Sequence, residues 1–106
     1  AVSLKLVWTH VGLGVCSGPT QTPLSGARFD GLSLAQCYDK CMSFSSSLCL
    51  GISWRTGYCV VQVPDGQATS ANFPDYSALW TDNAGSAIIS ADFYGEGWNC
   101  YRREPK

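Results

Sequence analysis

Six cysteines are the residues of this chain whose spacing points most directly to a chemistry. They are Cys16, Cys37, Cys41, Cys49, Cys59 and Cys100. An even number of cysteines in a short chain predicts a disulfide framework, which persists in an oxidising compartment. Zinc sites need closely spaced cysteines or cysteine with histidine, and redox dithiols use a Cys-x-x-Cys motif. Because the chain has no such motif and a single histidine, we expect disulfides and neither a metal nor another cofactor.

Groups that could perform acid, base or nucleophilic catalysis are few. His10 lies in a Gly-rich apolar segment, whereas a triad needs histidine beside a nucleophile and an orienting acid. Asp92 and Glu96 have the types needed for a glycosidase pair, but solvated loop carboxylates are the commoner interpretation. Asp82 lacks the spaced oxygen ligands of a calcium loop. We therefore predict that the protein is not an enzyme.

The composition is that of one folded domain, which we assign to residues 1–106. Hydrophobic residues make up 45% of the chain and charged residues 14%, and the net charge is −1. Such a balance argues against electrostatic binding to nucleic acid or to an anionic membrane surface. No apolar run approaches the ~20 residues of a membrane-spanning helix. For a secreted protein, we expect that a signal peptide preceding Ala1 has been removed.

The elements that must position these cysteines include one clear helix, predicted over residues 33–44. Ser33 and Gln36 form a capping box at its start. The apolar positions fall on a single stripe at helical spacing. Cys37 and Cys41 lie on that stripe, so both are expected to face the core.

Short strands are predicted around this helix. Apolar residues alternate over 2–8, as in a half-buried strand. The β-rich runs 50–55 and 58–63 flank Thr56-Gly57, which indicates a hairpin. Further strands are expected over 77–81, 86–90 and 97–103, and loops over 17–31 and 64–75, where glycine and proline cluster.

This order of features resembles a PAN/apple domain, of the six-cysteine apple-like subset, over residues about 16–103. In that family a capped helix carries two cysteines four apart, a third cysteine opens a strand and a fourth closes the following hairpin. Cys49-Leu50-Gly51-Ile52 matches the third element, and Gly57-Tyr58-Cys59 matches the fourth. The chain departs from the family in a longer stretch between Cys59 and Cys100 and in the fifteen residues before Cys16.

The resemblance implies a fold and a class of function. The fold is α+β, with an antiparallel β-sheet curled around a single α-helix and stapled by disulfides. The implied pairing is Cys16–Cys100, Cys37–Cys59 and Cys41–Cys49. PAN/apple modules occur in secreted proteins and adhesins, where they bind proteins or carbohydrates without catalysis. We therefore expect a secreted, extracellular interaction module that mediates protein–protein association, with a carbohydrate-binding, lectin-like adhesion module as the alternative.

Aromatic residues are the candidates for partner binding in the second half of the chain. Most aromatic side chains of a small domain belong to its core. Those left exposed would contact a protein partner in preference to a sugar, because a sugar cleft usually also needs acid and amide groups. The candidates are Phe73, Tyr76, Trp80, Phe93 and Tyr94.

The first fifteen residues, 1–15, are predicted to be an N-terminal strand extension that associates with another chain. The apolar candidates on one of its sides are Val2, Leu4, Leu6 and Trp8. The alternation changes phase near Thr9-His10, which predicts a bulge, and Gly12 and Gly14 suit the close approach of another backbone. An apolar edge strand recruits partners by strand addition, and identical copies joined head to tail would form a filament. The alternative is that this segment completes the domain's own sheet.

Overall fold

The computed structural model describes residues 8–19, 22–82, 85–92 and 97–104. The predicted contact residues Val2, Leu4, Leu6, Phe93 and Tyr94 lie outside these ranges. Within them the chain forms, in order, β1 (Trp8–Leu13), β2 (Val15–Ser17), β3 (Gly26–Asp30), α1 (Leu34–Met42), β4 (Gly51–Arg55), β5 (Tyr58–Gln62), β6 (Ala78–Trp80), β7 (Ser90–Asp92) and β8 (Asn99–Arg103).

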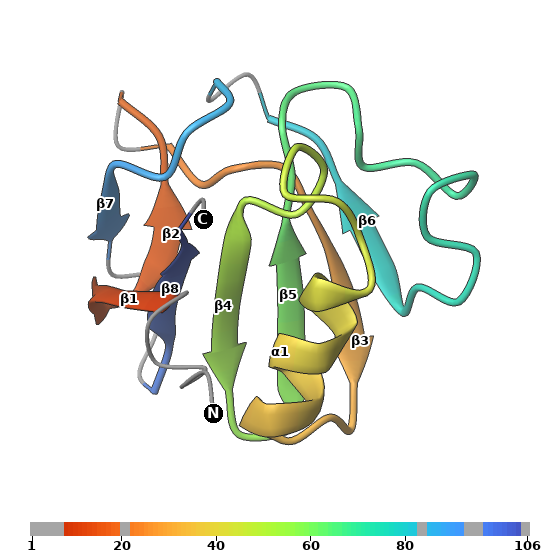
Figure 1. The fold of residues 1–106 in the computed structure, drawn as a ribbon, viewed down its shortest axis with the longest axis horizontal. Helices are drawn as coiled ribbons and strands as arrows, with labels where there is room; N and C mark the ends of the chain where they lie inside the picture. Colours follow the sequence, from red (N-terminus) through yellow and green to blue (C-terminus); the bar gives the residue numbers. More distant parts are fainter. Residues whose placement is uncertain (1–7, 20–21, 83–84, 93–96, 105–106) are drawn as a thin grey trace.

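Six of these strands form one antiparallel sheet in the order β1-β8-β4-β5-β3-β6. The strands β2 and β7 form a separate antiparallel pair. Helix α1 lies across one face of the large sheet, in front of β4 and β5 (Figure 1). The described residues therefore have the expected α+β architecture, with one helix packed on an antiparallel sheet.

Helix α1 begins where its capping box predicts. The backbone N–H of Gln36 donates to Ser33 Oγ at 3.2 Å, and Gln36 Oε1 accepts from the Ser33 N–H at 2.9 Å. The helix ends at Met42 rather than at residue 44, with Ser43 as the C-cap. Cys37 is buried on the side that faces the sheet.

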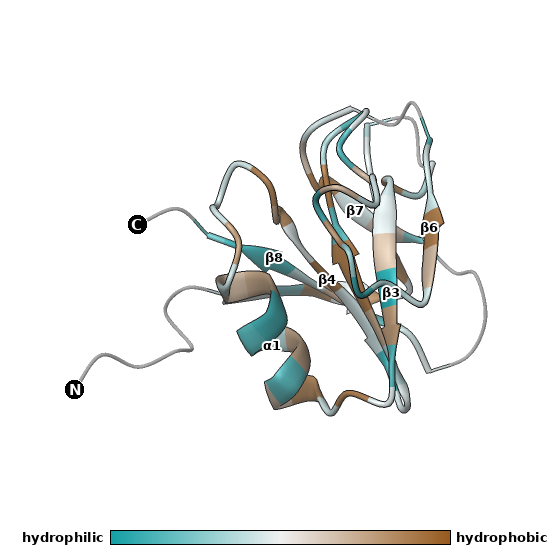
Figure 2. Ribbon diagram, turned by 90° about the vertical axis from the view of Figure 1, so that its right-hand side faces the viewer, coloured by the Kyte–Doolittle hydropathy of each residue, from teal (hydrophilic) through white to brown (hydrophobic). Residues whose placement is uncertain are grey.

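The large sheet separates two buried clusters, since α1 covers one face and β7 lies on the other side (Figure 2). On the α1 side the cluster takes alternate residues of the central strands, among them Ile52 of β4 and Val61 of β5. On the opposite side it comprises Cys16, Leu24, Ile88 and Cys100. Alternation along each strand supplies both clusters, because successive side chains point to opposite faces.

Three disulfides join these elements, and the described cysteines include no free thiol. They are Cys16–Cys100, Cys37–Cys59 and Cys41–Cys49, which is the pairing implied by the PAN/apple resemblance. Two of them tie α1 to the elements that follow it, and the third connects β2 with β8. No helix of the described chain is long and apolar enough to cross a membrane.

The prediction of a loop over residues 17–31 is wrong for Gly26–Asp30. These residues form β3, which lies inside the large sheet between β5 and β6. The glycine at its start indicated a turn, but Gly26 has a packing role. A Cβ on Gly26 would lie 3.0 Å from Val60 Cγ1 and from the Val61 carbonyl oxygen, so the neighbouring strand leaves little room for a side chain. The strand predicted over 86–90 is also displaced, since β7 covers Ser90–Asp92.

The described part of the N-terminal segment belongs to the domain's own sheets. Strand β1 pairs with β8, and its register shifts between His10 and Gly12, next to the position at which a bulge is predicted. Gly14 has a φ of 119°, and a Cβ there would lie 2.3 Å from the backbone oxygen of Asp92. The backbone that Gly14 allows to approach is thus that of β7 in the same chain.

Candidate functional site

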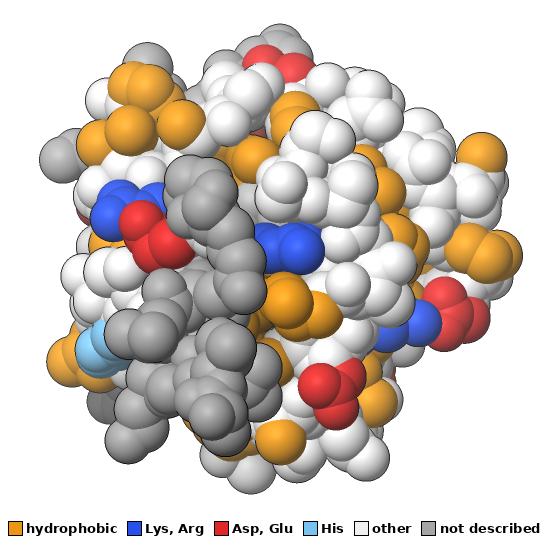
Figure 3. Space-filling view, viewed as in Figure 1, with side chains coloured by type: hydrophobic (Ala, Val, Ile, Leu, Met, Phe, Trp, Pro, Cys, Tyr) orange, Lys and Arg blue, Asp and Glu red, His pale blue; other side chains and the backbone are white. Residues whose placement is uncertain are grey.

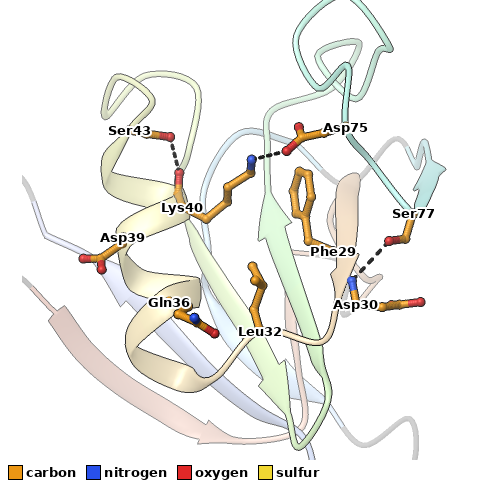
Figure 4. Close-up of a pocket in the computed structure, with 9 residues that line it drawn as sticks. All are labelled: Phe29, Asp30, Leu32, Gln36, Asp39, Lys40, Ser43, Asp75 and Ser77. Carbon is orange, nitrogen blue, oxygen red and sulfur yellow. Dashed lines mark hydrogen bonds and ion pairs between the residues drawn. The ribbon is translucent and has the colours of Figure 1, made fainter.

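A groove of about 520 Å³ opens between α1 and the chain that leads into β6 (Figure 4). Its volume is in the range of small-molecule sites, roughly 300–1,000 Å³. Apolar side chains, including Phe29, form part of its wall, and carboxylates, an amide and hydroxyls form the rest. We call it the helix groove. Its lining residues are Phe29, Asp30, Leu32, Gln36, Asp39, Lys40, Ser43, Asp75 and Ser77.

Lys40 crosses the helix groove, and its ammonium group contacts both Asp75 and Phe29. Its Nζ lies 2.5 Å from Asp75 Oδ2 and 4.6 Å from the centroid of the Phe29 ring (Figure 4). The hydrogen bond from Lys40 lowers the pKa of the Asp75 carboxyl. Because the ammonium group lies over Phe29, that ring is not an open stacking surface for a ligand.

Phe73 holds the far wall of the groove in place, and its assignment to partner binding is wrong. Its side chain is 0% exposed. The ring packs edge-on against Phe44, with centroids 4.9 Å apart, and against Phe29 at 6.1 Å. Burial of a large aromatic side chain is strongly favourable, so in a loop of mostly polar residues this side chain anchors the loop to the core.

The other described candidates differ in accessibility. Tyr76 is 42% exposed and is available for contact. Trp80 is half-buried, and its indole N–H donates to the Leu24 carbonyl at 3.0 Å. Trp8 is also half-buried and packs against Tyr38, with ring centroids 4.6 Å apart. Among the described residues, no ring contact joins Tyr76, Trp80 and Trp8 to one another.

Trp8 instead joins an aromatic cluster that spans β1, α1 and β8. Tyr38 contacts Tyr101 with centroids 5.6 Å apart, and Tyr101 contacts His10 at 5.0 Å. Burial, with a smaller effect of Tyr101, raises the pKa of Tyr38 to about 12. His10 Nε2 lies 3.0 Å from Asn99 Oδ1, so the hydrogen bond seen for its ring goes to an amide rather than to a nucleophile or a carboxylate.

A second surface, which the sequence did not indicate, lies on the sheet face opposite α1. The register places Tyr58 of β5 directly opposite Asp30 of β3 and Arg55 of β4. The Arg28 guanidinium lies over the Tyr58 ring, 5.4 Å from its centroid, and the Trp98 ring lies 6.3 Å from it. We call Arg28, Arg55, Tyr58 and Trp98 the arginine–aromatic row. Alternation along β5 could have predicted this position. Successive side chains of a strand point to opposite faces, so if Cys59 faces α1, Tyr58 faces away from it.

The charges of the described surface are sparse. On the α1 face, charged side chains form separate spots rather than one continuous patch (Figure 3). Among the described residues, no group of three or more histidine, cysteine or acidic side chains could hold a metal ion. Asp92 accepts a hydrogen bond from Ser90 Oγ at 3.0 Å, while Glu96, four positions further along the chain, lies outside the described residues.

Comparison of the chain with protein-family models gives no matching family, and searches of the curated proteins and of the solved structures give no significant match. Three disulfides, one helix and a sheet-dominated fold do not by themselves identify a PAN/apple domain. The family assignment therefore remains a prediction from the cysteine and helix pattern.

Proposed function

We propose that this chain is a secreted, extracellular and non-catalytic interaction module of PAN/apple type, which associates with other protein chains through the outer edge of β1. The observation that carries the proposal is the position of β1 at the end of the six-stranded sheet. Among the described strands it pairs with β8 alone. Leu13, at its end, is 75% exposed. An apolar edge strand of this kind is a template for strand addition.

The other end of the sheet supports self-assembly. Strand β6 pairs with β3 alone among the described strands, so the sheet also ends at β6. If β1 of one copy adds to β6 of the next, the two contact surfaces differ and the sheet continues from chain to chain. Such a head-to-tail contact does not close on itself unless the rotation forms a ring, and it otherwise gives a filament. An extracellular polymer is therefore the assembly that we propose.

A charge placed beside the β1 edge tests this proposal. Lysine on an edge strand opposes strand addition, so Leu13→Lys is expected to weaken association by roughly tenfold. Ile89→Lys is the matched control, because Ile89 is a 56% exposed apolar residue that precedes β7. The measurements are light scattering over a concentration series and electron microscopy. A monomeric wild-type protein, or equal loss of association in both variants, would contradict the proposal.

The alternative function is carbohydrate binding in the helix groove. It is favoured by the mixture of carboxylate, amide and hydroxyl groups on the groove wall. Asp39 is exposed, and its carboxylate forms no hydrogen bond or ion pair with another described residue. A glycan that binds the wild type on an array and not Asp39→Asn would support this function. Failure of the wild type to bind any arrayed glycan would argue against it.

A further inference from the structure

The arginine–aromatic row crosses three adjacent strands of the large sheet and ends beside the start of a fourth. Arg28 lies on β3, Tyr58 on β5 and Arg55 on β4, and Trp98 immediately precedes β8. Neighbouring strands are spaced about 4.8 Å apart, so the row is about 14 Å long. Tyr58 is 38% exposed, Arg55 is also exposed, and the other two side chains are half-buried.

The row has more positive than negative charge among the described residues. Arg28 forms an ion pair with Asp30, with Nε 2.8 Å from Oδ1. Arg55 has no such partner in the described part of the chain; its side chain packs over Gly97, where an added Cβ would lie 3.6 Å from Arg55 Cγ. Packing against Gly97 thus positions the Arg55 side chain, and no described residue forms an ion pair or hydrogen bond with its guanidinium. A guanidinium binds a carboxylate through two parallel hydrogen bonds.

The residue types of the row are those that carry the binding energy of protein interfaces. Tryptophan, tyrosine and arginine are enriched among interface residues whose truncation costs most. Here they are held in contact with one another, since the Tyr58 ring touches both the Arg28 guanidinium and the Trp98 ring. Contacts made before binding reduce the side-chain entropy that a complex must overcome.

We propose that the arginine–aromatic row is a docking surface for a protein segment that presents a carboxylate beside an aromatic or large apolar side chain. The carboxylate pairs with Arg55, and the apolar side chain packs on Trp98 and on the exposed part of Tyr58. This surface lies on a face of the sheet, so it is separate from the β1 edge, and its occupant is a different chain from the self-assembly partner.

An acidic glycan is the other ligand that an arginine and two aromatic rings can bind. Stacking of a sugar needs an open ring face. Arg28 covers one face of Tyr58, and the Trp98 ring lies beside it. The geometry thus favours a protein segment, which can bring a charged and an apolar side chain to two neighbouring positions.

Selection from a phage library of random peptides about twelve residues long tests the proposal. The intact wild-type protein is the bait, and enriched peptides are then titrated against Arg55→Gln and Trp98→Ala. We expect enrichment of aspartate or glutamate next to an aromatic residue. Each substitution should weaken binding about 30-fold, the factor that corresponds to a hot-spot loss of ~2 kcal/mol. The same peptides with glutamine in place of the acid should bind at least about tenfold more weakly.

Two matched controls separate this surface from the rest of the molecule. Met42→Ala removes a large apolar side chain of similar exposure, 40%, at the end of α1, and Arg102→Gln removes an arginine whose Nε pairs with Glu104 at 2.6 Å. Both should retain wild-type affinity, and all variants should keep the wild-type denaturation midpoint. The proposal is overturned if enriched peptides lack acidic residues, if binding is unchanged in Arg55→Gln and Trp98→Ala, or if a sulfated heparin-derived oligosaccharide binds through Arg55 while no peptide does. Because the readout is peptide affinity, it does not depend on whether the β1 edge drives association.

Discussion

The two sides of the large sheet are built by different means. On the α1 side, two disulfides connect cysteines 22 and 8 residues apart, and the enclosed cluster is apolar. On the opposite side, one disulfide connects cysteines 84 residues apart, and the small apolar cluster lies beside buried polar groups. The disulfides of the α1 side thus join cysteines that are close in the sequence. The disulfide of the opposite side joins a cysteine near the start of the chain to one near its end.

The polar groups of the second side form a continuous hydrogen-bonded network. The buried amide of Gln62 donates from Nε2 to the Leu24 and Ser25 carbonyls, both at 3.1 Å. Its Oε1 accepts from Ser53 Oγ at 2.6 Å, and Ser53 Oγ accepts from the Cys16 N–H at 2.9 Å. In the described residues no buried side-chain polar atom is left without a partner. Apolar contacts adjust to substitution, whereas such a network specifies one arrangement of its strands.

The largest expected effect comes from the disulfides. Replacing Cys16 and Cys100 together by alanine should lower the free energy of unfolding by about 4.5 kcal/mol, from the chain-entropy relation for its loop. Replacing Cys41 and Cys49 should cost about 2.5 kcal/mol, because the loop is shorter. Guanidinium denaturation measures both. Equal losses, or a larger loss for the second pair, would show that loop length does not distinguish the two sides.

A substitution at the centre of the polar network compares the two cores directly. Gln62→Met keeps an unbranched side chain but leaves the Ser53 hydroxyl proton without its acceptor. The Leu24 and Ser25 carbonyls lose one donor each and keep the N–H groups of Trp80 and Val63. The substitution should therefore cost about 1–3 kcal/mol. Ile52→Val on the α1 side is the control and should cost about 0.5–1.5 kcal/mol. The denaturation midpoints of the two variants decide between them. If Gln62→Met is the milder change, the network does not stabilise the second side.

The helix cap is a smaller contribution on the α1 side. Ser33→Ala removes the hydroxyl that accepts from Gln36 N–H and should cost about 1 kcal/mol of unfolding free energy. Ser33→Asp restores an acceptor at the same position and should recover most of this loss. An unchanged denaturation midpoint in Ser33→Ala would contradict the contribution of the cap.

The smallest effect near neutral pH is that of Tyr38, whose titration changes stability only above pH 10. Its pKa is raised to about 12 by burial, so between pH 10 and 12 the unfolded chain has lost this proton while the native chain keeps it. Unfolding is therefore favoured as the pH rises through that window, and below pH 10 the group has no effect. The absorbance of tyrosinate, compared between wild type and Tyr38→Phe, should show one late-titrating tyrosine. Identical titration curves above pH 11 would contradict the shift.

Sequence reasoning succeeded where a signal and its structural consequence lie within a few residues. Ser33 and Gln36 are three positions apart, and the capping box they predict is formed. The hairpin at Thr56-Gly57 likewise follows from two adjacent residues and the alternation beside them, and β4 and β5 pair around it. Sequence reasoning failed for β3, because the sequence does not distinguish a glycine that permits close packing of strands from a glycine that forms a turn.

The candidate sites were less predictable for the same reason. Lys40 and Asp75 meet across the helix groove although 35 positions separate them. Tyr58 and Trp98 touch only because β8 returns beside β4, a pairing that no local pattern specifies. Phe73 illustrates the converse, since an aromatic residue in a polar loop is compatible with either exposure or burial until its neighbours are known.

The amino-acid sequence by itself determined the disulfide-rich class, the helix with its start, the central hairpin and the face of α1 that carries Cys37 and Cys41. These depend on capping, turn and periodicity effects that act over one or two turns of chain. The tertiary structure alone decided the strand order, the position of β3, the buried role of Gln62 and the grouping of Arg55 with Trp98. Those features depend on contacts between distant segments, and their free energy comes from burial and hydrogen bonding that exist only once the sheet is assembled.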